Sequence, residues 1–293
     1  MSLSEWSMKD LKVWDDKIID IAKNHGLDWF DINYEICDYY EMIGHMSYHG
    51  MPSHYNHWSY GKTFERTHLN YNMGQSGLPY EMIINSNPSI AYLMMQNPLY
   101  LQILIMAHCV GHSDFFKNNR CFKDTDPEHV VSRMRNAKKR IQSYIEDPSI
   151  GQEKVEAFLD NLHAIKYQTN RYGTPRKTRA EVKDNEVKRY NKYKEKGISL
   201  DYDSLDTKRL LKPDHDMLSF FTEYYPDQFK NWQLDLIEIV KQDSWYFMPQ
   251  IQTKILNEGW ASFWHYKILH ELDLPDSMHL PFLKMHNAVV RPH

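Results

Sequence analysis

The segment NPLYLQILIMAHCVGHSDFF, residues 97–116, is the most informative part of this 293-residue chain for its fold. Only Gln102 and His108 interrupt its long apolar run. The pair Asn97-Pro98 is typical of a helix N-terminus, because Asn caps helices well and Pro suits the first helical position. A helix that is apolar nearly all round is expected at the centre of a protein. We therefore predict a buried central helix over residues 97–116.

Apolar side chains recur at helical spacing on both sides of this segment. We predict helices over residues 4–24, 31–47, 127–146, 152–168, 214–225, 226–242 and 249–272. The best strand candidate is Tyr80–Asn85. Residues 50–77 are rich in Gly, His, Tyr and Asn and lack a sustained period, which predicts an aromatic, histidine-containing loop. The expected fold is mostly α, a single compact multi-helix domain with a small β element.

Composition and charge exclude several classes of protein. Lys and Arg total 35 and Asp and Glu total 39, so the net charge of −4 argues against a chain that binds nucleic acid along its whole length. Aromatic residues make up 14%, too many for a disordered chain. Three cysteines without a CxxC motif favour a reducing compartment. The N-terminus is polar and no apolar run is long enough to span a bilayer, so we expect a soluble cytoplasmic protein.

The segment Arg171–Gly197 differs in charge from the rest of the chain. It contains ten basic and four acidic residues and few apolar ones. Such a pattern predicts a mobile insertion or a solvated helix between two halves of the helical core, residues 1–170 and 198–293. The alternative is a docking site for an anionic polymer or a protein partner.

His108 and His112 form the first candidate site. Their i, i+4 spacing places both imidazoles on one face of the central helix, where they can bind one metal ion. Burying two imidazoles is costly unless they are metallated or hydrogen-bonded, and the sequence leaves both alternatives open. A zinc peptidase helix of the HExxH type has Glu at the second position, where this chain has Cys109. The missing Glu argues against a peptidase of this ordinary type, unless another carboxylate supplies the base.

Glu258 is the candidate third ligand, on the last long predicted helix. Gly259 and Ala261 beside it are small enough for another helix to approach closely. His265 is seven residues further on, so it lies on the same face two turns away. Two His from one helix and a Glu from another are a known zinc ligand set. The alternative is a surface Glu258 that pairs with Lys254.

Three further residues are candidates for catalysis. The loop predicted over residues 50–77 contains His57 among aromatic residues suited to a polar ligand, although the same aromatics can simply pack on one another. Glu35 lies on the helix predicted before it. Cys109 between two histidines allows a Cys/His nucleophile pair, but adjacent residues on a helix point apart.

Several long strings resemble the stage V sporulation protein R family. They are HWSYGKTFE (57–65), YEMIINSNPSIAYLM (80–94), AHCVGHSDFFKNN (107–119), NEGWASFWHYKILHEL (257–272) and HNAVVRPH (286–293). The family's His-x-x-x-His pattern falls on His108 and His112, and its Asn-Glu-Gly-Trp pattern on Asn257–Trp260. His57 and Glu65 match its aromatic loop. The family sequence continues past HNAVVRPH, so the chain resembles an N-terminal core.

The resemblance implies a role in forming the spore cortex, which is peptidoglycan, from the cytoplasm. Our preferred hypothesis is an enzyme that acts on amide bonds of peptidoglycan stem peptides, by hydrolysis or transpeptidation. His108, His112 and Glu258 would hold a divalent metal, expected to be Zn²⁺, on a helical core like that of zinc peptidases. His265 or Glu35 would orient the substrate or shuttle a proton.

Two alternatives remain open at this point. One is a non-catalytic scaffold of a spore-development complex, docked through the basic segment. The other is an amide-bond enzyme that uses Cys109 and a histidine. The expected partners are a peptidoglycan peptide or precursor and a sporulation protein, without nucleic acid or a membrane span.

Overall fold

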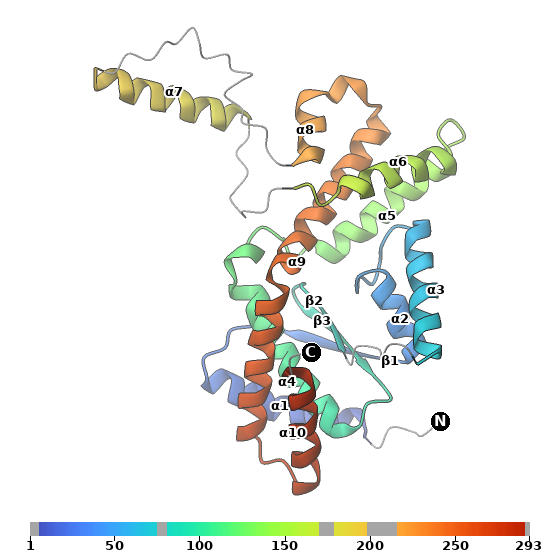
Figure 1. Cartoon of the computed structure of the whole chain (residues 1–293), viewed down its shortest axis with the longest axis vertical. Helices are drawn as coiled ribbons and strands as arrows, with labels where there is room; N and C mark the ends of the chain where they lie inside the picture. Colours follow the sequence, from blue (N-terminus) through green and yellow to red (C-terminus); the bar gives the residue numbers. More distant parts are fainter. Residues whose placement is uncertain (1–5, 75–80, 170–178, 198–215, 291–293) are drawn as a thin grey trace. The chain divides into compact units, whose positions relative to one another are not determined.

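The computed structural model describes residues 6–74, 81–169, 179–197 and 216–290. Within these residues the chain forms ten α-helices and three strands, which confirms a mostly α fold with a small β element (Figure 1). The strands are β1 Ile32–Cys37, β2 Glu81–Ile84 and β3 Ser89–Met94. The helices are α1 Met8–Asn24, α2 Tyr39–Ser47, α3 Trp58–Asn72, α4 Leu99–Asn118, α5 Val130–Glu146, α6 Gln152–Ile165, α7 Arg179–Glu195, α8 Met217–Tyr224, α9 Asn231–Glu271 and α10 Asp276–Val290.

The chain divides into two compact units where the sequence predicted a single domain. The core unit comprises Met1–Val155 and Gln250–His293, and the second unit comprises Glu156–Pro249. Helix α9 begins in the second unit and ends in the core unit. The sequence predicted two separate helices here, over residues 226–242 and 249–272. This prediction was wrong, since α9 continues through Pro249.

The sheet has the strand order β1-β3-β2, with β1 parallel and β2 antiparallel to β3. The predicted strand at residues 80–85 is confirmed as β2. The predicted helix over residues 31–47 is wrong in its first half, which is β1. Ile32, Tyr34 and Ile36 alternate with more exposed neighbours, and a spacing of four residues fits this period of two as well as it fits a helix.

Helix α4 is the predicted central helix and is buried along nearly its whole length. It begins at Leu99, with Pro98 as the N-cap residue, one position later than the sequence predicted. Apolar side chains of α1, the sheet, the end of α9 and α10 pack against it in one cluster. Each large apolar side chain buried there contributes roughly 1.5–3 kcal/mol. This packing holds α4 rigidly enough to position functional side chains.

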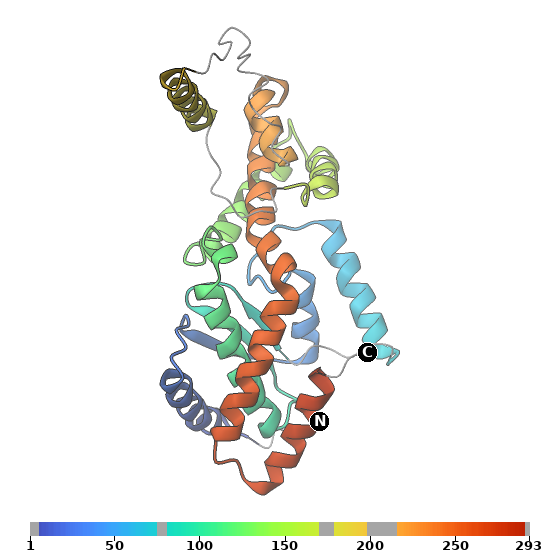
Figure 2. The same ribbon diagram turned by 60° about the vertical axis from the view of Figure 1, so that its left-hand side comes forward.

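Helices α4 and α9 approach each other unusually closely at one point. A Cβ atom added to Gly111 would lie 2.8 Å from the Cα atom of Ala261, so only glycine fits there. Figure 2 shows the C-terminal part of α9 running beside α4. The small Ala261 therefore has the role predicted from the sequence. The crossing brings the turns that contain the two candidate histidines against the turns that contain Glu258 and His265.

Helices α2 and α3 lie on the other face of the sheet. The ring of His45 from α2 stacks on the ring of Tyr92 from β3, with centroids 3.7 Å apart. The prediction of an irregular loop over residues 50–77 is wrong for residues 58–72, which form α3. Trp58 and Leu69 of this helix stay exposed, which hid its amphipathic pattern from the sequence analysis.

The basic segment forms helix α7 over residues 179–195, and its described side chains are exposed or half-buried. The preceding residues 171–178 lie outside the described part of the chain. Among the described helices, none is long and apolar enough to cross a membrane.

Candidate metal centre

His108 and His112 project from the same face of α4, as their spacing predicts. Both are buried, each with 4% of its surface exposed, and their ring centroids are 4.5 Å apart. The carboxylate of Glu258 faces them from α9. Its Oε2 atom lies 3.7 Å from Nε2 of His108 and 3.8 Å from Nε2 of His112. The three residues predicted to share a metal therefore converge.

Glu81 is a fourth member of this cluster that the sequence analysis missed. It is the first residue of β2, and its Oε1 atom lies 3.7 Å from Nε2 of His108. Ligand atoms of Glu81, His108 and His112 all lie within 4.8 Å of one another. One sequence signal could have found it. In the alternating strand Glu81–Ile84, Glu81 shares a face with Ile83, which packs against the core, so a carboxylate points inward.

Burial and the neighbouring charges shift the pKa values in this cluster. Burial raises the pKa of Glu81, although the His108 ring opposes the shift. The His108 ring lowers the pKa of Glu258, followed in effect by burial, which raises it, and by His112. Burial and the neighbouring His108 lower the pKa of His112 to about 4. The His112 ring is therefore neutral near pH 7 and has a lone pair for a metal.

Each candidate histidine ligand has a hydrogen-bond partner for its other ring nitrogen. The Nδ1–H of His112 donates to Oδ1 of Asn257 at 2.8 Å, which leaves Nε2 as the lone-pair nitrogen that faces Glu258. Nδ1 of His108 lies 2.8 Å from Nδ1 of His265. Partners of this kind orient metal-binding histidines and select their tautomer. His265 therefore lies behind His108, on the side away from the carboxylates.

The string Asn257–Trp260 makes two separate contacts with α4. Asn257 and Glu258 belong to the metal cluster, as described above. The indole Nε1–H of Trp260 donates to Oδ2 of Asp114 at 2.9 Å, which ties α9 to α4 beside the metal cluster. Gly259 has no atom within 4 Å of its added Cβ position and borders open space.

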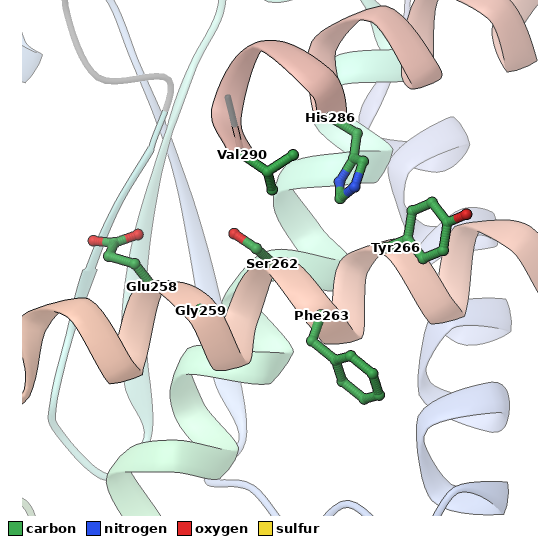
Figure 3. Close-up of a pocket in the computed structure, with 7 residues that line it drawn as sticks. All are labelled: Glu258, Gly259, Ser262, Phe263, Tyr266, His286 and Val290. Carbon is green, nitrogen blue, oxygen red and sulfur yellow. The ribbon is translucent and has the colours of Figure 1, made fainter. Parts of the chain in front are cut away.

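That open space is a groove between α9 and α10 with a volume of about 610 Å³ (Figure 3). It is lined by Glu258, Gly259, Ser262, Phe263, Tyr266, His286 and Val290. The side chain of Glu258 is 53% exposed, so the groove begins at the metal cluster. None of the described residues 50–74 lines this groove, whereas the sequence predicted that residues 50–77 form the wall of the site; residues 75–77 lie outside the described part of the chain.

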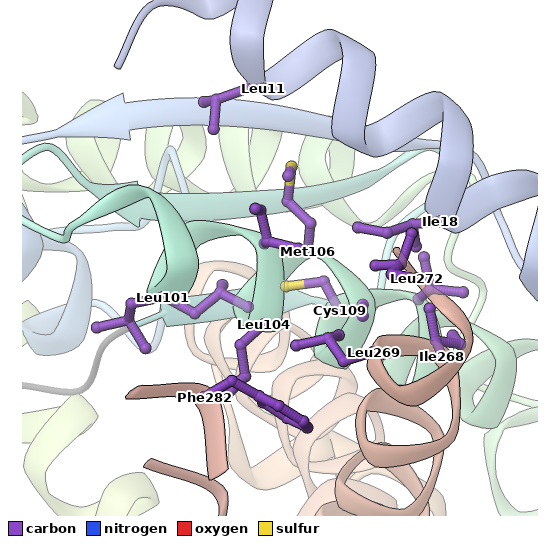
Figure 4. Close-up of a cluster of buried hydrophobic side chains, with 14 of the residues drawn as sticks. Leu11, Ile18, Leu101, Leu104, Met106, Cys109, Ile268, Leu269, Leu272 and Phe282 are labelled. Atoms are coloured by element: carbon purple, nitrogen blue, oxygen red, sulfur yellow. The ribbon is translucent and has the colours of Figure 1, made fainter. Parts of the chain in front are cut away.

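The structure contradicts the prediction of Cys109 as a nucleophile. Its side chain lies in the apolar cluster around α4, among residues such as Met106 and Leu269 (Figure 4). Cys109 is fully buried, and burial raises the pKa of its thiol well above the usual range. A nucleophilic cysteine needs an accessible thiolate, which this environment disfavours.

Glu35 and His57 also lie outside the cluster. Glu35 pairs with Tyr92 in the sheet, whereas Glu81 pairs with Leu93 next to it. Adjacent strand positions point to opposite faces, so the Glu35 side chain is on the α2 side of the sheet. His57 caps the N-terminus of α3, and its Nδ1 atom lies 2.7 Å from Oγ of Ser59.

A family model described as SpoVR like protein matches residues 5–293. The chain belongs to the SpoVR-like family. The strings that resemble this family are the ones that build the cluster, since His108, His112, Asn257 and Glu258 all come from them. Glu81 lies in a third such string, residues 80–94.

This SpoVR-like chain is 36% identical over 303 residues to the Escherichia coli (strain K12) protein YcgB. The match covers 98% of this chain and 59% of that protein, so the chain spans about three fifths of its relative's length. No solved structure matches the chain.

Proposed function

We propose that this SpoVR-like protein binds one divalent metal ion, with Zn²⁺ as the expected ion, through Nε2 of His108, Nε2 of His112 and the carboxylate of Glu258. The observation that supports this is the spacing of the three ligand atoms, at 3.7 and 3.8 Å. Ligands bound tetrahedrally at zinc distances lie about 3.4 Å from one another, so a small inward movement would complete the site.

Glu81 would supply the carboxylate that the sequence lacks at position 109. It reaches the cluster from β2, so it approaches the metal from a different direction than Glu258 on α9. A metal ion held there would supply a water of lowered pKa and a positive charge that polarises a carbonyl group. Glu81 would then accept the proton of that water, the task that the Glu of HExxH performs in zinc peptidases.

The proposed substrate is an amide bond in a peptide of peptidoglycan, with the spore cortex as the setting in spore-forming bacteria. The family's sporulation name supports the setting, and the groove beside Glu258 supports a chain-like substrate. Its lining combines the aromatic Phe263 and Tyr266 with the hydroxyl of Ser262, a mixture suited to a peptide backbone.

A second candidate is a scaffold without catalysis, acting with a protein partner in the cytoplasm. The exposed charged helix α7 favours it, because a solvated helix rich in Lys is available for docking. Both candidates can be separated by testing whether the metal site is required for activity.

The test is zinc binding to the purified protein, measured by calorimetry. Wild type should bind one equivalent of Zn²⁺. Glu258→Ala should weaken binding by more than the roughly 10–100-fold that loss of an outer-shell partner causes. Glu271→Ala is the matched control, because Glu271 lies on the same helix but pairs with His25 at the surface. Wild-type protein without zinc affinity, or equal affinity in Glu258→Ala, would overturn the metal site.

A second measurement separates the enzyme from the scaffold. Zinc-loaded protein is incubated with a peptidoglycan tetrapeptide, and released amines are quantified. Release by wild type and its loss in His112→Ala support the enzyme. Zinc binding with no release from a panel of stem peptides supports the scaffold.

A further inference from the structure

Three histidines form a continuous hydrogen-bonded chain from the metal cluster to the groove. Nδ1 of His108 on α4 lies 2.8 Å from Nδ1 of His265 on α9. Nε2 of His265 lies 2.8 Å from Nδ1 of His286 on α10. His265 has no exposed surface, so no water competes for either of its ring nitrogens. His286 lines the groove (Figure 3).

His265 is neutral, and its neutrality makes the two hydrogen bonds depend on each other. His265 has no exposed surface and both of its ring nitrogens lie against other imidazole rings, and a ring kept from water favours its uncharged form. A neutral imidazole has one N–H donor and one acceptor nitrogen. When His265 accepts from His108 it must donate to His286, and when it accepts from His286 it must donate to His108. The chain therefore has two directions, and both bonds reverse together.

In the first direction His108 donates from Nδ1, so its Nε2 has the lone pair that a metal requires. His286 then accepts at Nδ1, and its proton is on Nε2. In the reverse direction His286 donates from Nδ1 and its Nε2 becomes an acceptor, while His108 carries its proton on Nε2. That proton would face the carboxylates of Glu81 and Glu258, each 3.7 Å away, which favours the reverse direction when no metal is bound.

We propose that His265 couples the metal centre to the groove. A metal on Nε2 of His108 sets the chain in the first direction and converts Nε2 of His286 from an acceptor into a donor. The metal-loaded groove therefore binds a ligand that offers a hydrogen-bond acceptor at His286, and the metal-free groove does not. This inference rests on the metal site proposed above.

The groove favours a neutral acceptor, the carbonyl of a peptide. Its lining contains no Lys or Arg, so an anion would meet no cationic side chain there. Phe263, Tyr266 and Val290 supply apolar surface beside His286. Because Nδ1 of His286 bonds to His265, Nε2 is the polar atom that this ring offers to the groove. A peptide carbonyl that accepts from Nε2 of His286 would therefore lie in the same groove as Glu258.

Nitrogen-15 NMR of the wild-type protein tests the coupling directly, because it distinguishes the two tautomers of each histidine. We expect His286 to carry its proton on Nδ1 without metal and on Nε2 after one equivalent of Zn²⁺. An identical His286 tautomer in both states would overturn the inference. Calorimetry on the same samples separates the two failures. Zinc binding without a tautomer change leaves the metal site standing, and absent zinc binding overturns both.

Variants at position 265 test the route of the coupling. His265→Leu cannot transmit a hydrogen bond, so zinc should bind roughly 10–100-fold more weakly and the His286 tautomer should no longer respond. His265→Gln should restore the response, because its amide has one donor and one acceptor with a spacing like that of the ring nitrogens. His270→Leu is the control, an exposed histidine on the same helix. A response that survives in His265→Leu would overturn the proposed route.

The neutral probe acetyl-alanyl-alanine amide tests the groove. Its affinity, followed by NMR shifts, should be about 5–150-fold higher for zinc-loaded than for metal-free wild type, the usual range of coupling between sites. This ratio should fall in zinc-loaded His265→Leu, which separates the coupling from direct contact of the probe with zinc. Equal probe affinity with and without zinc in wild type would overturn the coupling.

Discussion

Helix α4 carries two polar clusters against α9, less than two turns apart, and they differ in how their atoms are paired. At Asp114 both carboxylate oxygens accept hydrogen bonds. Oδ1 accepts from the backbone N–H of Asp28 at 2.9 Å and from Nδ2 of Asn118 at 3.1 Å. Oδ2 accepts from Nε1 of Trp260 at 2.9 Å. We call this cluster closed, because both carboxylate oxygens of Asp114 have hydrogen-bond donors.

The cluster at His108 and His112 is open. Its Nε2 atoms and the carboxylates of Glu81 and Glu258 face one another at 3.7 and 3.8 Å, which is longer than a hydrogen bond. Two carboxylates in a partly buried place also repel each other. The closed cluster stabilises the helix pair, whereas the open cluster lowers stability until a ligand fills it. This difference separates a structural contact from a candidate site on the same helix.

The largest effect is expected where one change breaks both clusters. In Gly111→Val the new side chain would meet the backbone of Ala261, and α4 and α9 would have to separate. We expect a loss of about 3 kcal/mol in the free energy of unfolding, measured with urea, together with loss of zinc binding. Gly259→Ala is the control, because its added Cβ meets no atom within 4 Å. A stable Gly111→Val protein that binds zinc would contradict the close crossing.

Breaking only the closed cluster should lower the free energy of unfolding without weakening zinc binding. Asp114→Ala removes the carboxylate that accepts from the Asp28 backbone N–H and the Trp260 indole, and one of three acceptors of the Asn118 amide, at a cost of about 2 kcal/mol. Zinc affinity measured by calorimetry should stay within about threefold of wild type, because sites without shared partners act nearly independently. Asp114→Asn keeps one acceptor oxygen, so its free energy of unfolding should fall by less than that of Asp114→Ala. A large drop in zinc affinity would show that the clusters act as one.

The open cluster should make stability depend on pH. The pKa values of His112 and His265 are about 4 and about 2 in the folded chain, below the ordinary value near 6.5 of an unfolded histidine. Below about pH 6.5 the unfolded chain binds more protons, so the free energy of unfolding of the metal-free protein should fall progressively toward pH 4. Urea unfolding at several pH values measures this slope. His265→Gln removes one of these groups and should reduce the slope; an equal slope would count against neutral burial of His265.

The smallest effect is expected from a substitution in the apolar cluster around α4. Cys109→Ala removes a buried sulfur from the apolar cluster and should cost about 1 kcal/mol in urea unfolding. Zinc affinity and any amidase activity should remain, because the thiol is fully buried in this apolar cluster. Loss of zinc binding in this variant would contradict the placement of the Cys109 thiol outside the metal site.

Local patterns in the sequence predicted those parts of the fold that depend on neighbouring residues. The central helix, the shared face of His108 and His112 and the strand near residue 81 follow from spacing alone. The helix predicted over residues 31–47 was half wrong, because Ile32 and Ile36 fit a strand equally well and only pairing with β3 selects it. Helix α3 was missed because some of its apolar side chains, such as Trp58 and Leu69, are exposed, so its sequence shows no clear apolar face.

The sequence by itself determined that two buried imidazoles share one face of α4 and that Glu258 has small neighbours, because 3.6 residues per turn is a local property. Only the tertiary structure decided that Glu81 joins them, that Cys109 faces the core and that His265 and His286 extend the chain to the groove. These are contacts between distant parts of the sequence; His108 and His265 are 157 residues apart. They form because Gly111 and Ala261 let α4 and α9 meet, and no local pattern encodes which helices cross.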